Sequence, residues 1–230
     1  MNNEFIKAIE SNNINKVRLL LADPFTNPAF HNNFAIQRAS EYGQTEIVKL
    51  LLADPRANPA ADDNKSIRLA SLNGHTEIVK LLLADPRVDP AANSNIAIQL
   101  ASRDGHIKVV NLLLADPRAD PAGDNNDVIQ WASRNGHTEV IKLLLADLRV
   151  NPAARNDLAI RWASGYGHSE VVKLLLADPR VDWRLADPVI KTELVKTSEN
   201  KLKTELTNIY LILERSSPKT TFGKEKSLDN

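Results

Sequence analysis

The chain has 230 residues, of which 43% are hydrophobic, and its 29 lysines and arginines are balanced by 29 aspartates and glutamates. Because the net charge is zero, nothing in the overall electrostatics favours nucleic acid or an anionic membrane, and we expect neither as a partner. The chain has no cysteine, which excludes disulfides, thiolate nucleophiles and cysteine-ligated zinc and fits an intracellular, cytoplasmic location.

The first segment, MNNEFIKAIESNN, is polar and acidic and lacks the pattern of a signal peptide. It fits an N-terminal half-cap whose outer side is solvated by Lys7 and Glu10. No apolar run approaches the ~18 residues that a bilayer crossing requires, so we expect no membrane span.

The segment GHTEIVKLLLADPR recurs, with small variations, every 31 residues along most of the chain. Its glycine is Gly43, Gly74, Gly105, Gly136 and Gly167, and Asn12 holds the same place in the first copy. Such a fixed period is the signature of a stacked repeat architecture. We divide the chain into six repeats, at residues 2–32, 33–63, 64–94, 95–125, 126–156 and 157–187.

Each repeat predicts a short first helix and a second helix. In the first helix, isoleucine and alanine stand three residues apart, as in Ile36 and Ala39, and the recurring glycine ends the helix in a left-handed conformation. A short polar residue precedes each first helix and is predicted to be its N-cap. These predicted caps are Asn33, Asn64, Asn95, Asn126 and Asp157.

The second helix is typified by TEIVKLLLAD, in which Ile47, Val48, Leu51 and Leu52 form an apolar stripe and Lys49 points outward. The Asp-Pro pair after it predicts the helix end, because proline disfavours a helical conformation in the residue before it. In the fifth copy Leu148 replaces that proline, so we expect a weaker stop there. A lone helix pair cannot bury this stripe, and stacking of the copies can.

The chain after the sixth repeat loses the period but keeps a helical pattern. We expect residues 188–215 to form a helical C-terminal cap, with Leu202, Leu206, Ile209 and Leu213 on one face, and Trp183 to help seal it. Residues 216–230 have the composition of a disordered tail.

The motif A-S-x-x-G-H-T-E-I-V-K-L-L-L-A resembles the helix-turn-helix of the ankyrin repeat, whose usual period is 33 residues. The repeat sequence that includes LLLADPRVDPAA resembles the repeats in the ankyrin-repeat proteins of giant DNA viruses of amoebae. The resemblance implies an all-α, ankyrin-type helical-hairpin solenoid that binds proteins. This chain lacks the family's threonine-proline-leucine-histidine opening and has a connector two residues shorter. We therefore expect the family's β-hairpin fingers to be reduced to tight turns.

No pattern in the sequence supports catalysis, and we predict that the chain is not an enzyme and holds no cofactor or metal. His75, His106, His137 and His168 lie one repeat apart, about 10 Å by the usual helix spacing, which is too far to share an ion. We predict local hydrogen bonds for them. The serines at Ser40, Ser71, Ser102, Ser133 and Ser164 are identical in context, so we assign them to packing.

Positions that vary between otherwise identical copies are the candidates for partner binding. The resemblance places the first helices along a concave groove, with the variable residues on its surface. The candidates are Trp131, Trp162, Tyr166, Arg103, Arg134, Leu100, Arg38 and Tyr42. Aromatic residues rimmed by arginine match the composition of binding hot spots. Alternatively, the two tryptophans simply pack between neighbouring first helices.

The leading hypothesis is a monomeric, non-catalytic scaffold that binds a protein partner through the concave face. The alternative is an adaptor that recruits a larger complex, for example a ubiquitin ligase, through residues 188–215. Burial of the apolar face that includes Ile209 against the sixth repeat would favour a cap over a docking element.

Overall fold

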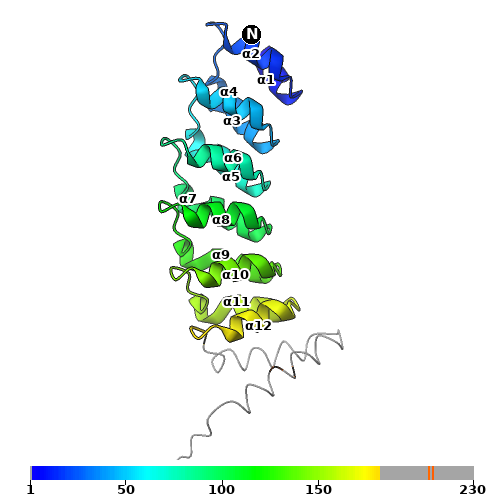
Figure 1. Cartoon of the computed structure of the whole chain (residues 1–230), viewed down its shortest axis with the longest axis vertical. Helices are drawn as coiled ribbons and strands as arrows, with labels where there is room; N and C mark the ends of the chain where they lie inside the picture. The colour runs from blue at the N-terminus through cyan, green and yellow to red at the C-terminus, as the bar shows by residue number, and fades with distance from the viewer. Residues whose placement is uncertain (1, 182–206, 208, 210–230) are drawn as a thin grey trace, which may run out of the picture.

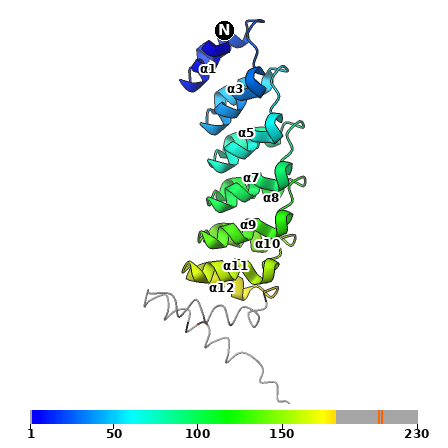
Figure 2. The ribbon, with the colours of Figure 1, turned by 180° about the vertical axis from the view of Figure 1, so that it is seen from behind.

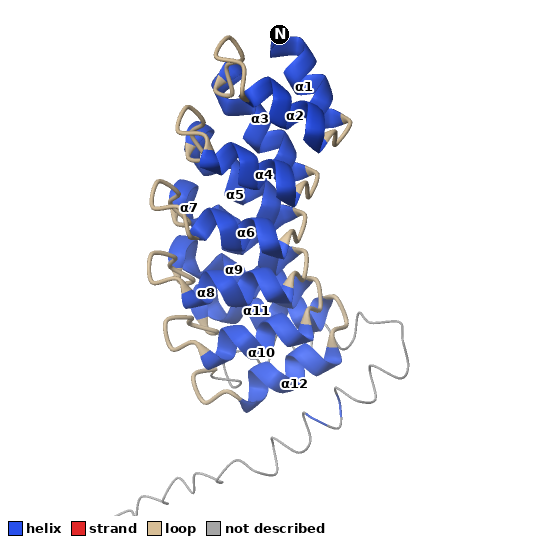
Figure 3. Cartoon of the chain, turned by 45° about the horizontal axis from the view of Figure 1, so that its top comes forward, coloured by secondary structure: helices blue, strands red, loops and turns tan. Residues whose placement is uncertain are grey.

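A computed structural model describes residues 2–181, 207 and 209 (Figure 1). Residues 2–181 contain twelve helices joined by short turns, with no strand among them (Figure 3). The helices are α1 Asn2–Glu10, α2 Ile14–Leu21, α3 Phe30–Glu41, α4 Thr45–Ala53, α5 Ala61–Leu72, α6 Thr76–Leu83, α7 Ala92–Arg103, α8 Ile107–Ala115, α9 Gly123–Arg134, α10 Thr138–Ala146, α11 Ala154–Gly165 and α12 Ser169–Ala177. The expected all-α solenoid, with turns in place of β-hairpin fingers, is confirmed.

Consecutive helices form pairs that stack one above the next along the long axis of the molecule (Figures 1 and 2). The odd-numbered first helices pack against one another, and the even-numbered second helices do the same. Neighbouring first helices contact each other more extensively than neighbouring second helices do. The row of first helices forms one side of the stack, the side expected to be concave.

The core consists of the apolar residues that recur at the same positions of each repeat. The paired isoleucine and alanine of each first helix, such as Ile98 and Ala101, are at most 1% exposed. In the second helix α4, Ile47, Val48 and Leu51 are fully buried, while Lys49 is exposed. Burying each such isoleucine or leucine stabilises the fold by roughly 1.5–3 kcal/mol. One continuous core results, running from Phe5 in α1 through every repeat.

The turn between the two helices of a pair depends on a left-handed residue, as predicted. Gly105 has φ +76° and the other four recurring glycines have similar values, while Asn12 takes the same region in the first copy. A second constraint acts on these glycines. A Cβ on Gly105 would lie 2.6 Å from Nδ1 of His137, a residue of the next repeat. The glycine thus serves both the turn and the contact between repeats.

The predicted N-cap role is wrong for the four asparagines, Asn33, Asn64, Asn95 and Asn126. Before the helical part of α7, Asn93, Ser94 and Asn95 all have positive φ and form one left-handed turn. Asparagine and aspartate tolerate this region best among residues with a Cβ, which explains the Asn/Asp-rich connectors. The turn directs Asn95 away from its own helix, and its Oδ1 accepts from the backbone N–H of Asp120, 2.7 Å away.

The same bond recurs in the other repeats, so these side chains hold the start of each repeat to the connector that leaves it. Asn33, Asn64 and Asn126 accept from the backbone N–H groups of Asn58, Asp89 and Asn151. Three of the first helices also steady the left-handed turn with a glutamine. In α7, for example, Nε2 of Gln99 donates to the Ser94 carbonyl oxygen at 2.7 Å.

The expectation of a weaker helix stop at Leu148 is not met. Helix α10 ends at Ala146, and the next residue, Asp147, is extended with ψ 115°, as Asp54 is after α4. Leu148 is 90% exposed and takes no part in the stop. The aspartate before it does, because its Oδ1 accepts from the backbone N–H of Arg149 at 3.0 Å.

Most of the expected C-terminal cap lies outside the described residues, as do Trp183 and residues 216–230. Of the four apolar positions proposed for the cap, Ile209 is described, is half-buried and packs against the core.

Candidate functional site

The first-helix face carries an aromatic cluster made by three of the predicted residues, Trp131 on α9, Trp162 on α11 and Tyr166 just after α11. Both tryptophans occupy the same position in neighbouring repeats and are half-buried. Their ring centroids lie 5.5 Å apart with an interplanar angle of 47°. Tyr166 is 54% exposed. The rings thus pack between the two first helices and also form part of the surface.

The Arg134 guanidinium lies among these three rings. Its central carbon is 5.2 Å from the Trp131 ring centroid, 5.4 Å from that of Trp162 and 5.1 Å from that of Tyr166. Cation–π attraction of this kind contributes about 0.5–2 kcal/mol per contact, depending on desolvation. The sequence placed Arg134 beside the tryptophans, but the convergence of three rings on one guanidinium was not predicted.

Arg103, one repeat earlier, has a different environment. Its Nε and Nη2 donate to the two carboxylate oxygens of Asp104, at 2.8 and 3.0 Å. This bond lowers the pKa of the Asp104 carboxyl and raises the pKa of Arg103. Leu100, on the same helix, is half-buried on the first-helix face.

Arg38 and Tyr42 belong to a second cluster, separated from the tryptophans by α5 and α7. The Arg38 guanidinium lies over the rings of Phe34 and Tyr42, at 4.9 and 5.4 Å, and its Nη1 donates to Glu41 Oε2 at 2.7 Å. That bond raises the pKa of Arg38. The eight candidates therefore do not form one site. Trp131, Arg134, Trp162 and Tyr166 form what we call the tryptophan cluster.

The four recurring histidines are structural residues that join repeats. Nε2 of His137 lies 2.8 Å from the Arg103 carbonyl oxygen, 34 residues earlier, and so carries the proton that it donates. His75, His106 and His168 make equivalent bonds. Hydrogen bonding was predicted for them, but the bonds are between repeats and not local. In the second copy Gln44 takes this place and donates to the Ile9 carbonyl oxygen.

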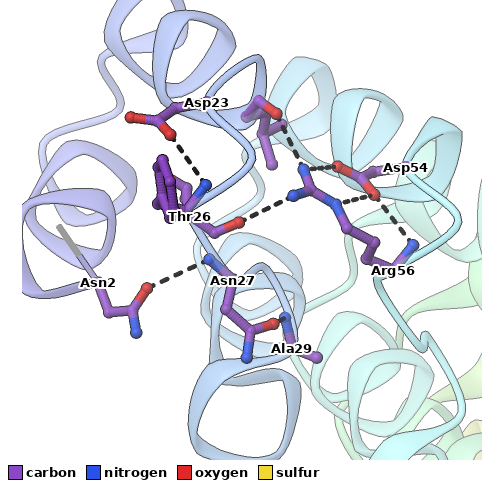
Figure 4. A network of polar contacts seen from close by, with 9 residues as sticks. Asn2, Asp23, Thr26, Asn27, Ala29, Asp54 and Arg56 are labelled. Atoms are coloured by element: carbon purple, nitrogen blue, oxygen red, sulfur yellow. Dashed lines mark hydrogen bonds and ion pairs between the residues drawn. The ribbon is translucent and has the colours of Figure 1, made fainter.

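A further link between repeats, the arginine clamp, was missed by the sequence reading. In the turn after α4, Arg56 pairs with Asp54 and donates to the carbonyl oxygens of Thr26 and Leu21 in the repeat before it, at 3.0 and 2.9 Å (Figure 4). The later arginines at this place also donate to carbonyls of the preceding repeat. They are Arg87, Arg118, Arg149 and Arg180.

The recurring serines are fully buried, in agreement with a packing role. No three His, Cys, Asp or Glu side chains among residues 2–181 are grouped so that they could hold a metal ion. None of the helices α1–α12 is long and apolar enough to span a membrane.

The helix pairs stack through contacts that recur from copy to copy, and the side chains that vary lie on one face. These features define a helical-hairpin repeat protein. A family model described as ankyrin repeats (3 copies) matches residues 5–94, 36–123 and 98–187. The chain therefore belongs to the ankyrin repeat family. The crystal structure of EF0377, an ankyrin repeat protein, is similar with a TM-score of 0.66 and 22% identity over 77% of this chain and 98% of that one. At this identity the likeness concerns the fold alone. No curated protein sequence matches the chain.

Proposed function

We propose that the chain is a non-catalytic scaffold that binds a protein partner through the concave row of first helices. Ankyrin repeats generally act as protein–protein interaction modules, and this chain belongs to that family. The observation that carries the proposal here is the tryptophan cluster, because Trp131 and Trp162 sit on the variable positions of neighbouring repeats and remain partly exposed.

The physical basis is preorganisation. The first helices are held by buried isoleucines, by histidine bonds and by arginine clamps that are the same in nearly every copy. A rigid surface loses little conformational entropy when a partner binds, so less of the contact energy is offset by the cost of ordering that surface. Tryptophan, tyrosine and arginine are also the residue types enriched in binding hot spots.

The proposed scaffold acts as a monomer in the cytoplasm. If the resemblance to the ankyrin proteins of giant viruses reflects a viral origin, the partner is a host or viral protein. The alternative adaptor role depends on residues 188–215, of which only Thr207 and Ile209 are described. The packing of Ile209 against the core supports a cap at that point of the segment.

Affinity capture from a lysate of the cells in which the protein is made tests the proposal. Three forms are compared: wild type, the Trp131→Ala/Trp162→Ala double variant, and Leu148→Ala as a control on the exposed turn after the second helix α10. Circular dichroism first verifies that all three are folded. A protein captured by wild type and by Leu148→Ala but lost with the double variant supports the proposal. Capture that all three forms share assigns the tryptophans to packing alone.

A further inference from the structure

Three arginines on the first helices, Arg38, Arg103 and Arg134, were predicted as partner-binding residues, and they differ in one respect. Arg38 donates to the carboxylate of Glu41, and Arg103 is bidentate on the carboxylate of Asp104. Arg134 makes no ion pair and no side-chain hydrogen bond with any residue of the described chain; its contacts are the three aromatic rings. Of these three arginines, two are therefore paired with a carboxylate and one is not.

The donors of Arg134 are free to bind an acceptor. None of its nitrogens is among the fully buried, unpaired side-chain nitrogens, so they reach the surface. A guanidinium stacked on aromatic faces keeps its N–H groups at its edge, where they match the two oxygens of a carboxylate. The rings also fix the side chain, which reduces the entropy that a ligand must overcome.

We propose that Arg134, framed by Trp131, Trp162 and Tyr166, receives a carboxylate side chain of the protein partner. The partner then binds through an acidic segment, with an apolar side chain next to the Glu or Asp that contacts the exposed ring surface. This inference rests on the proposed function and specifies the chemistry of its partner.

A carboxylate fits this site better than a phosphorylated side chain. A phosphate carries a charge of about −1.5 to −2 and is usually bound by a cluster of arginines. Here the nearest concave arginine in the preceding repeat, Arg103, is already neutralised by Asp104. One free guanidinium balances one carboxylate.

Selection of a random twelve-residue peptide library on the immobilised full-length chain tests the proposal. Peptides retained by wild type but not by Trp131→Ala/Trp162→Ala are collected and sequenced. We expect them to share a Glu or Asp beside an apolar residue. One such peptide is then synthesised with its acidic residue as Glu, Gln or phosphoserine, and binding is measured by fluorescence anisotropy.

The decisive measurement is a double-mutant cycle between protein and peptide. Arg134→Gln and the Glu→Gln peptide should each weaken binding about tenfold or more, and together little more than either alone. Arg134→Lys keeps the charge but loses the planar fork and should recover only part of the affinity. Lys49→Gln removes one positive charge from the second helix α4, where Lys49 is exposed and pairs with Glu46; it is the control and should change the affinity less than about twofold.

The outcomes distinguish failure of the carboxylate proposal from failure of the proposed scaffold function. Cluster-dependent peptides without an acidic residue, additive effects in the cycle, or tighter binding of the phosphoserine peptide overturn the carboxylate and leave the concave scaffold standing. If no peptide depends on the two tryptophans, the proposed function fails as well. If the cluster instead binds a second copy, sedimentation shows a dimer that Arg134→Gln dissociates, which also overturns the proposal.

Discussion

The Arg118 guanidinium donates to the Val88 carbonyl oxygen across 2.8 Å, although the two residues are 30 positions apart. The same side chain donates to the Leu83 carbonyl oxygen and pairs with Asp116 in its own turn. One arginine therefore connects two consecutive repeats through backbone oxygens that every sequence provides.

Loss of this clamp should destabilise the stack. Hydrogen bonds to a charged group contribute roughly 1.5–3 kcal/mol, so we expect Arg118→Gln to lower the free energy of unfolding by about that amount. Urea denaturation followed by circular dichroism measures it. Phe25 stands at the same place in the first helix pair, where the described structure has no earlier connector, and is 78% exposed. Phe25→Gln is thus the control and should be nearly neutral; an equal effect of both changes would contradict the clamp.

Gly105→Ala should be costly for two separable reasons. The left-handed backbone costs about 1–2 kcal/mol for a residue with a Cβ. The new Cβ would also meet the His137 ring at 2.6 Å. In a His137→Ala background the ring is absent and only the backbone strain remains. Gly105→Ala should therefore lower the stability less in that background than in wild type. Equal costs in both backgrounds, measured by thermal unfolding, would show that the ring yields without strain.

Leu148→Pro should stabilise the protein by about 0.4–1 kcal/mol, because proline restricts the unfolded chain. The other four copies of this turn after the first repeat carry proline, at Pro55, Pro86, Pro117 and Pro179. Asp147 before it has nearly the same φ and ψ as Asp116, which precedes a proline. The Leu148 backbone N–H donates to no backbone group of the described chain. A lower melting temperature would show that the turn does not accept proline.

Acid should weaken the stack through the aspartates of the clamps. The hydrogen bond from the neighbouring arginine lowers the pKa of each of these carboxyls, Asp54, Asp85, Asp116, Asp147 and Asp178. An unfolded aspartate has a pKa of about 3.9, so below that pH the unfolded state binds more protons than the folded state. The stabilisation is therefore complete above about pH 4 and is lost as the pH falls through the lower folded values.

Urea midpoints recorded from about pH 6 downward check this dependence. In Arg118→Gln the Asp116 carboxyl loses the side-chain hydrogen bond that lowers its pKa most and keeps only the one from the backbone N–H of residue 118, so the midpoint should fall less steeply with acid than in wild type. An unchanged slope would mean that other carboxylates cause the loss of stability.

The sequence predicted the elements that depend on residues close in the chain. The left-handed turn at Gly105 and the buried pair of Ile98 and Ala101 followed from spacing alone, and the structure has both. Asn95 was misassigned as a cap because three left-handed residues in a row are not apparent from a pattern that also fits an N-cap. The clamp of Arg118 was missed because its acceptors are backbone carbonyls of another repeat, which no side-chain pattern marks.

The candidate site was predicted in part for the same reason. Helical spacing placed Trp131, Trp162 and Tyr166 on one face, and the structure brings their rings together. Spacing could not show that Arg134 turns toward those rings while Arg103 turns to Asp104, because the two arginines occupy equivalent positions. The difference depends on the neighbours that each guanidinium finds in three dimensions.

The links between repeats all have one direction along the chain. Each arginine clamp and each histidine ring donates backward, to carbonyl oxygens of the repeat that precedes it. During translation the amino-terminal repeat leaves the ribosome first, so the acceptors of every junction are in place before the donors emerge. Assembly can then proceed as a zipper in the order of synthesis, with each new copy closing onto a surface that is already formed.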